Sequence, residues 1–208
     1  MQAPLLARER PLLLGSGSPR RAQILEGLGV PILVRTAEID EGWREGESPE
    51  HYVERIVGEK AEAVRERVAP LVPKCPALLV ADTLVTLDGE VLGKPRDLDE
   101  SRRMLAQLSN RTHRVLTRFR VERRDGEARE MTVATEVTFR ELPGSLIEAY
   151  AQTGEGLDKA GSYALQGKGA LLVRSVVGSV TGIIGLPATE VTEALVELGL
   201  WEPFSSYE

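Results

Sequence analysis

The sequence is poor in cysteine, histidine and aromatic residues, and each scarcity argues against a class of protein. Its 208 residues include one cysteine, Cys75, two histidines and 4% aromatic residues. A single cysteine forms neither an internal disulfide nor a thiolate metal cluster, which fits a reducing, cytoplasmic setting. His51 and His113 are too far apart in the chain to suggest a motif, and no Ser–His–Asp order surrounds Ser16 or Ser18. Nucleophilic serine catalysis is therefore disfavoured.

Long apolar runs and an excess of positive charge are also missing. No run approaches the ~20 apolar residues needed to cross a bilayer, and the first residues carry charges where a signal peptide would be apolar. We therefore expect no membrane association and no secretory signal. Lys and Arg total 26 against 32 Asp and Glu, a formal net charge of -6. Duplex nucleic acid is then an unsuitable partner, because phosphate-backbone binding needs basic patches, whereas a small anion needs only a few cations in one cleft.

The residues that are present point to a folded protein of one domain. Hydrophobic residues make up 42% of the chain and charged residues 28%, which is ordinary globular composition and enough for a substantial core. A length of 208 residues is close to the usual size of one domain, so we expect a single domain over residues 1–208.

Apolar runs and turn residues divide the chain into short strands and helices. The expected strands cover residues 12–14, 31–35, 77–81, 84–87, 90–92, 112–122, 130–139, 171–177 and 180–184. The expected helices cover residues 19–28, 49–68, 97–108, 143–152 and 187–198, with Trp201 and Phe204 packing against the last one. Hairpin signals such as Asp88-Gly89 alternate with helical crossovers, which predicts a mixed sheet in an α/β protein.

The first chemical motif is Gly-Ser-Gly-Ser-Pro-Arg-Arg at residues 15–21, between a strand and a helix that Ser18 is expected to cap. Arg20 and Arg21 would meet the positive end of the helix dipole, which is locally unfavourable unless an anion binds there. Small residues let backbone N–H groups approach a phosphate that the arginines can clamp. We therefore favour a phosphate site over a solvated helix start with surface arginines.

Asp82 and Thr83 follow the apolar segment 77–81 and are expected at its end. Ligands of α/β sheets gather beyond the carboxyl ends of strands, so an aspartate there is placed to bind a cation or to polarise water. Taken alone, a capping or turn aspartate is an equally good interpretation.

Lys60 lies inside the apolar stripe of the second predicted helix, four residues after Ile56 and four before Val64. A lysine on a buried face needs a partner or a ligand, and snorkelling to the rim is the evenly weighted alternative. Lys94 follows the hairpin that returns the chain toward Asp82, although on its own it reads as a surface lysine.

Two further segments offer ligand groups. The acidic residues after the second strand, which include Glu41, could join Asp82 in holding a hard divalent cation, and a solvated loop is the alternative. The glycine-containing segment 158–167 ends near Gln166, whose amide donor and acceptor suit the edge of a nucleobase, and a structural turn is the alternative.

In their order and spacing these segments resemble the Maf family of nucleoside triphosphate pyrophosphatases. The resemblance covers the chain from Leu12 to about Leu200. It is carried by residues 15–21 (GSGSPRR), 39–41 (IDE), 81–83 (ADT), 92–97 (LGKPRD), 108–113 (LSNRTH), 154–161 (GEGLDKAG) and 185–187 (GLP).

The resemblance implies a two-lobed α/β fold, related to inosine triphosphate pyrophosphatases, with a nucleotide cleft between the lobes. It implies hydrolysis of a nucleoside triphosphate to monophosphate and pyrophosphate with Mg²⁺ or Mn²⁺, and it leaves a homodimer open. Asp82 takes the role of general base and, with Glu41, of metal ligand. The residues assigned to substrate binding are Ser16, Ser18, Arg20, Arg21, Lys60, Thr83, Lys94 and Gln166.

Within the family, the chain is similar to the members that act on dTTP and UTP, because it has Arg20, Thr83 and Gln166 at the three positions that separate the subgroups. It departs from the family pattern at four places, of which the last could alter the cleft wall: Gly15 for the usual Ala, Leu165 for Ile, Asn110 for Gly, and Thr181-Gly182 for bulkier residues.

Two alternatives to this function stay open. One is a nucleotide-binding regulator of septum formation without catalysis, and the other is an inosine or xanthosine triphosphate pyrophosphatase. A pure binder has no use for a water-activating Asp82, so the complete set of acids and lysines favours an enzyme.

Overall fold

The computed structural model describes residues 5–204 and shows alternating strands and helices. The strands are β1 (Leu12–Leu14), β2 (Ile32–Val34), β3 (Ala77–Leu87), β4 (Glu90–Leu92), β5 (Thr112–Arg123), β6 (Ala128–Phe139) and β7 (Val173–Val177). The helices are α1 (Pro19–Gly27), α2 (Pro49–Ala63), α3 (Leu98–Leu108), α4 (Gly144–Ala151), α5 (Val180–Ile184) and α6 (Ala188–Glu197). Short helical turns cover Val64–Val68, Ala69–Leu71, Ala160–Ser162 and Lys168–Leu172.

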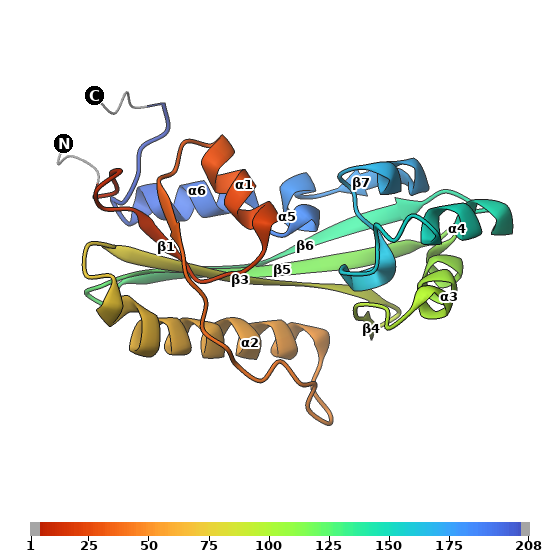
Figure 1. Cartoon of the computed structure of the whole chain (residues 1–208), viewed down its shortest axis with the longest axis horizontal. Helices are drawn as coiled ribbons and strands as arrows, with labels where there is room; N and C mark the ends of the chain where they lie inside the picture. The colour runs from red at the N-terminus through yellow and green to blue at the C-terminus, as the bar shows by residue number, and fades with distance from the viewer. Residues whose placement is uncertain (1–4, 205–208) are drawn as a thin grey trace.

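One mixed sheet runs through the molecule in the order β2-β1-β3-β5-β6-β7, with β4 paired to β3 (Figure 1). The pairs β1–β2 and β1–β3 are parallel, and the other pairs are antiparallel. The predicted α/β class with a mixed sheet is therefore confirmed. The long strands β3, β5 and β6 form its centre, and their pairing is continuous from Ala77↔Arg123 to Thr86↔Arg114 between β3 and β5.

Helices cover both faces of this sheet. On one face α2 packs against β3 and β5, and on the other α1, α5 and α6 pack above the sheet (Figure 1). Helices α3 and α4 pack against each other at the right-hand end of the sheet in Figure 1. One large apolar cluster includes Leu14, Phe119 and Leu195, and a second includes Leu105 and Phe139.

The alternation of side chains along β3 positions the site. Leu79 and Ala81 face the cluster under α1 and α6, whereas Leu78 and Val80 face α2. Because successive strand residues point to opposite faces, Asp82 continues the α2 side and Thr83 the α1 side.

This strand corrects one prediction. Asp82 and Thr83 do not follow the end of a strand over 77–81, because β3 continues without a break to Leu87. Their backbones pair with Arg118 and Thr117 of β5. Two polar residues in the middle of an apolar run look like a strand end, but here each polar side chain finds a partner on its own face of the sheet.

A second prediction is wrong at residues 180–184, which form helix α5 and not a strand. The Ser179 hydroxyl accepts a hydrogen bond from the Gly182 N–H and caps the helix, and Gly185 ends it at a φ of 129°. At the C-terminal end Trp201 is buried as expected, but Phe204 is fully exposed and packs against no helix. The remaining predicted elements are present with boundaries shifted by a few residues, apart from the segments 64–68 and 168–172, which form short helical turns.

No helix among residues 5–204 is both long enough and apolar enough to span a membrane.

Candidate active site

A cavity of about 660 Å³ opens between the start of α1, helix α2, the middle of β3 and the segment 158–166. Its walls include all ten of the residues that the sequence suggested: Ser16, Ser18, Arg20, Arg21, Glu41, Lys60, Asp82, Thr83, Lys94 and Gln166. The volume is that of a cleft for a ligand of nucleotide size.

On the α2 side of the cavity, Lys60 lies between two carboxylates. Its Nζ is 2.8 Å from Asp82 Oδ1 and 2.7 Å from Glu41 Oε1. The side chains of Lys60 and Asp82 are only 14% and 16% exposed, so the lysine points to partners and does not snorkel to solvent. The apolar face of α2 brings Lys60 to β3, and the alternation of β3 brings Asp82 to meet it.

The same two carboxylates fit a divalent cation. Glu41 and Asp82 offer hard oxygen donors that converge on one point, which the Lys60 ammonium now shares. Mg²⁺ is typically held by one or two carboxylates together with substrate phosphates. No group of three or more His, Cys, Asp or Glu residues able to hold a metal ion occurs within residues 5–204, so phosphate or water oxygens would have to complete the shell.

On the α1 side, Arg21 is buried, and its guanidinium group forms hydrogen bonds to other residues of the protein. Its Nε donates to the Gly185 carbonyl at 2.8 Å, and Nη1 donates to Ser16 Oγ at 2.7 Å. Nη2 lies 3.4 Å from Thr83 Oγ1, which in turn lies 3.0 Å from Thr117 Oγ1. Burial lowers the pKa of Arg21, and the nearby Asp82 opposes this shift. Arg21 thus ties the loop after β1, strand β3 and the end of α5 together, so the phosphate clamp expected of both arginines would fall mainly to its neighbour.

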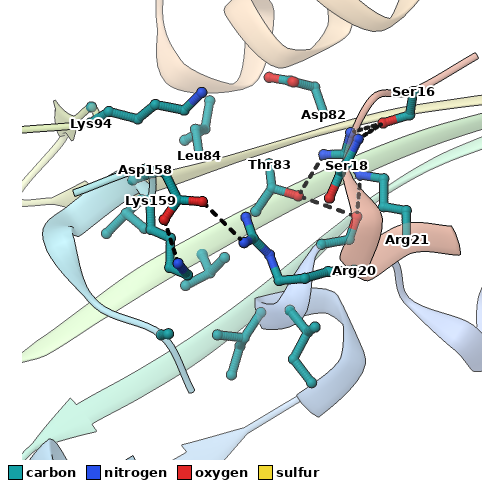
Figure 2. A pocket seen from close by; sticks show the side chains of 18 of the residues that line it. Ser16, Ser18, Arg20, Arg21, Asp82, Thr83, Leu84, Lys94, Asp158 and Lys159 are labelled. Carbon is teal, nitrogen blue, oxygen red and sulfur yellow. Dashed lines mark hydrogen bonds and ion pairs between the residues drawn. The ribbon is translucent and has the colours of Figure 1, made fainter. Parts of the chain in front are cut away.

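That neighbour, Arg20, reaches across the cavity. Its Nη1 lies 3.5 Å from Asp158 Oδ2, and Figure 2 shows the pair joining the start of α1 to the segment that also carries Lys159. Arg20 is about a third exposed, so its guanidinium is open to a ligand. Ser18 precedes α1 as predicted, but its side chain makes no capping hydrogen bond.

Lys94 and Gln166 also line the cavity. Lys94 extends along the wall in Figure 2 and forms no ion pair within the described residues. Gln166 is exposed, and its side-chain amide has no hydrogen-bond partner among residues 5–204. Val85, Val115 and Ile183 add an apolar wall.

Two contributors were missed by sequence reasoning. Tyr52 lines the cavity, and its hydroxyl donates to the Glu41 carbonyl at 3.0 Å, which holds the acidic loop against α2. Tyr52 lies eight residues before Lys60, and this spacing places both side chains on one face of the helix. The sequence therefore contained a signal that could have identified Tyr52. Asp158 lies in the segment 158–167 that was expected to offer ligand groups. Its pairing with Arg20 could not be predicted, because it depends on tertiary structure. Trp43 stacks on Tyr52 with ring centroids 4.8 Å apart.

The fold and the cavity define an α/β protein with an acidic and cationic cleft of nucleotide size. The family model for Maf-like proteins matches residues 11–198, and the chain belongs to this family. A dTTP/UTP pyrophosphatase of Chromobacterium violaceum is 45% identical over 92% of this chain and 96% of its own. One of Anaeromyxobacter dehalogenans is 46% identical over 92% of this chain and 97% of its own. Among solved structures, the Ham1 protein of Staphylococcus aureus aligns with a TM-score of 0.45 and 12% identity over 91% of this chain and 96% of that one.

Proposed function

We propose that this protein hydrolyses nucleoside triphosphates, dTTP and UTP above all, to the monophosphate and pyrophosphate. The observation that carries the proposal is the cluster of Asp82, Glu41 and Lys60 in one cleft with the partly exposed cation Arg20. Relatives named dTTP/UTP pyrophosphatase that are 45% identical over 92% of the chain support it.

Asp82 is the proposed general base for water that attacks the α-phosphorus. One of its oxygens is engaged by Lys60, and the other has no protein partner among residues 5–204, so it is available to accept a proton. A base that is held in place by a neighbour and reached through an open cleft meets the geometric requirement for general base catalysis.

Cations of the chain would stabilise the leaving pyrophosphate. Arg20 and Lys94 line the cavity, and Lys60 reaches it from α2. Charge that develops on phosphate oxygens in the transition state is stabilised by such preorganised cations. Glu41 and Asp82 would hold Mg²⁺ or Mn²⁺, which when bound supplies charge neutralisation on the phosphates and a more acidic water. Because Lys60 shares both carboxylates, it competes with such a cation for the same oxygens.

Base choice is assigned to the end of the cavity that holds Gln166. Uracil and thymine present acceptor, donor and acceptor groups along one edge, and an amide can pair with part of it. The methyl group that separates them is worth no more than ~1–3 kcal/mol in an apolar pocket, so both bases should be accepted. Thr83 acts in this proposal through its contacts with Arg21 and Thr117.

Product analysis over a panel of nucleoside triphosphates with Mg²⁺ or Mn²⁺ tests the proposal. We expect dTTP and UTP to give monophosphate and pyrophosphate, and CTP and purine triphosphates to be poor substrates. Efficient cleavage of inosine or xanthosine triphosphate would favour the related pyrophosphatases. Tight binding with no hydrolysis would favour a regulator. Phosphate release without pyrophosphate would contradict the reaction itself.

A further inference from the structure

The segment around Gln166 is anchored on both sides of that residue. After it, the Glu155 carboxylate accepts hydrogen bonds from the N–H groups of Lys168 and Gly169 at 3.0 and 2.8 Å. Before it, the N–H of Ala164 donates to the Tyr150 hydroxyl at 3.1 Å. Gln166 itself makes no side-chain hydrogen bond within residues 5–204, so its location depends on these backbone anchors.

Tyr163 provides a further anchor on the near side. It lines the cavity three residues before Gln166, and its hydroxyl lies 2.9 Å from Nε2 of His113 on β5. Both side chains are buried, at 5% and 2% exposure. The two rings meet edge to face with each other, and each also meets Phe139 edge to face.

Packing alone does not account for a histidine at position 113. Its Nδ1 is buried and has no hydrogen-bond partner among the described residues. Whichever nitrogen carries the proton, the bond to Tyr163 satisfies one ring nitrogen and leaves the other unpaired, which is unfavourable. Leucine or phenylalanine would fill the same space among apolar neighbours without this penalty.

We propose that His113 and Tyr163 form a positioning pair that sets where Gln166 meets the nucleobase, and so sets the discrimination between uracil and cytosine. The inference rests on the proposed function, because it assumes that Gln166 reads the base. The hydrogen bond between the Tyr163 hydroxyl and the His113 imidazole ties Tyr163 to strand β5. The chain between Tyr163 and the Glu155 anchor is then short enough to hold Gln166 in one place.

Three single variants and one double variant test the pair. Tyr163→Phe and His113→Leu each remove the bond and keep the packing, while His113→Gln keeps an amide that reaches about as far as Nε2. We expect the ratio of kcat/KM for UTP to that for CTP to fall about tenfold in the first two variants, since small misplacements of a positioning group carry penalties of this order. We expect His113→Gln to restore most of the ratio, and Tyr163→Phe with His113→Leu to lose no more than either alone.

A packing variant provides the control. Phe139→Leu loosens the same aromatic cluster but leaves the bond in place, so it should lower thermal stability without changing the UTP to CTP ratio. A ratio kept within twofold by Tyr163→Phe and His113→Leu would overturn the inference. So would a ratio that follows thermal stability across all variants.

An assay of the wild-type protein distinguishes failure of the proposed function from failure of the positioning pair. A wild type that does not hydrolyse UTP contradicts the proposed function, and the pair is then judged by calorimetric affinities for non-hydrolysable UTP and CTP analogues in the same variants. An unchanged affinity ratio in that series would equally overturn the positioning pair.

Discussion

Asp82 and Thr83 are neighbours in the chain, yet their side chains serve opposite faces of the sheet. Asp82 meets Lys60 of α2 at 2.8 Å, and Thr83 meets Arg21 of α1 at 3.4 Å. Each contact follows from the two-residue repeat of a strand. A single dipeptide therefore links the acidic side of the cleft to its cationic side.

Asp82→Asn should lower kcat by ~10²-fold or more, the usual loss when a general base is removed. The amide keeps the shape of the side chain and can still contact Lys60, so the fold and nucleotide affinity should be mostly retained. Steady-state kinetics with UTP and calorimetry with a non-hydrolysable analogue measure the two effects. Asp125→Asn in the exposed β5–β6 turn is the matched control. Near-normal turnover of Asp82→Asn would remove the base assignment.

Substitutions of Arg20 and Arg21 should have different effects. Loss of Arg20 should weaken substrate binding, and loss of Arg21 should lower stability. Arg20→Ala removes a partly exposed cation and should raise KM for UTP about tenfold with little change in Tm. Arg21→Ala leaves the buried Gly185 carbonyl with only a long contact of 3.5 Å from Thr83 Oγ1, and should lower the free energy of unfolding by ~1–3 kcal/mol. Arg21→Lys should restore little, because an ammonium cannot match the fork that reaches Gly185, Ser16 and Thr83.

Thermal unfolding and KM values for the three variants check this division. An unchanged Tm for Arg21→Ala would contradict the structural role of Arg21, and an unchanged KM for Arg20→Ala would contradict phosphate binding by Arg20.

His113 should make stability fall in weakly acidic solution. Burial lowers its pKa to about 4, whereas the unfolded chain binds that proton near pH 6.5. The unfolded state therefore binds more protons between these values, so this part of the stability is complete above about pH 6.5 and is lost as the pH falls toward 4. The slope from one histidine is at most ~1.4 kcal/mol per pH unit.

Urea unfolding of wild type and His113→Leu at pH 7, 6, 5 and 4.5 measures this slope. The variant should lose less stability over the series than the wild type, and His51→Asn, whose side chain is exposed on α2, is the matched control. Parallel curves for wild type and His113→Leu would contradict the titration.

At the scale of the element, the start of α2 could be read from the sequence and the course of β3 could not. Ser48 directly precedes Pro49, a pair of residues typical of a helix start, and the Ser48 hydroxyl accepts a hydrogen bond from the His51 N–H at 3.2 Å. The polar pair in β3 looked like a strand end because its partners are far away in the chain. Capping is local, whereas strand pairing and the Arg21 contacts depend on tertiary neighbours.

Helix α5 shows the same limit of local information. Its sequence, Val-Thr-Gly-Ile-Ile, is rich in β-branched residues and favours a strand. The Ser179 cap and a hydrogen bond from Thr117 Oγ1 to the Gly182 carbonyl at 2.8 Å hold it as a helix over β5. The residues around the cleft could thus be named from the sequence, but which of them are free to bind a ligand could not.

Gly15, directly after β1, lies so close to its neighbours that there is no space for a side chain. A Cβ built there would lie 2.7 Å from Val64 Cγ2 and 2.8 Å from Val80 Cγ1. Gly15→Ala, which introduces the usual family residue, should therefore destabilise this chain by ~1–3 kcal/mol through overpacking. Adding Val64→Ala should return part of the loss, because it removes the closest methyl group and leaves only that of Val80.

Gly58→Ala is the control for this pair. Gly58 is exposed on α2 with nothing within 4 Å of an added Cβ, so alanine should stabilise the helix by ~0.5–1 kcal/mol. Denaturant unfolding measures all three variants. A Gly15→Ala protein as stable as wild type would show that the valines give way easily.

At the scale of the whole molecule, the cleft draws its walls from segments that are far apart in the chain. The start of α1 and the segment 158–166 face each other across it, and β3 runs beneath both. Among the described residues, Arg20–Asp158 is an ion pair that joins these two walls. A bound triphosphate would contact the same cations and link the walls more strongly than this partly exposed pair does.

A non-hydrolysable dTTP analogue should accordingly stabilise the molecule and protect both walls together. At 100 times its Kd it adds ~2.7 kcal/mol, which for a chain of this size raises Tm by about 5–10 °C. Hydrogen exchange on the same complex should slow in residues 15–21 and in residues 158–167, while the exposed β5–β6 turn stays unchanged. Thymidine, which lacks phosphates, should protect the second segment alone and raise Tm less. Protection of one wall only by the triphosphate analogue would show that the ligand does not bridge the cleft, and would contradict the placement of phosphate at Arg20 and base at Gln166.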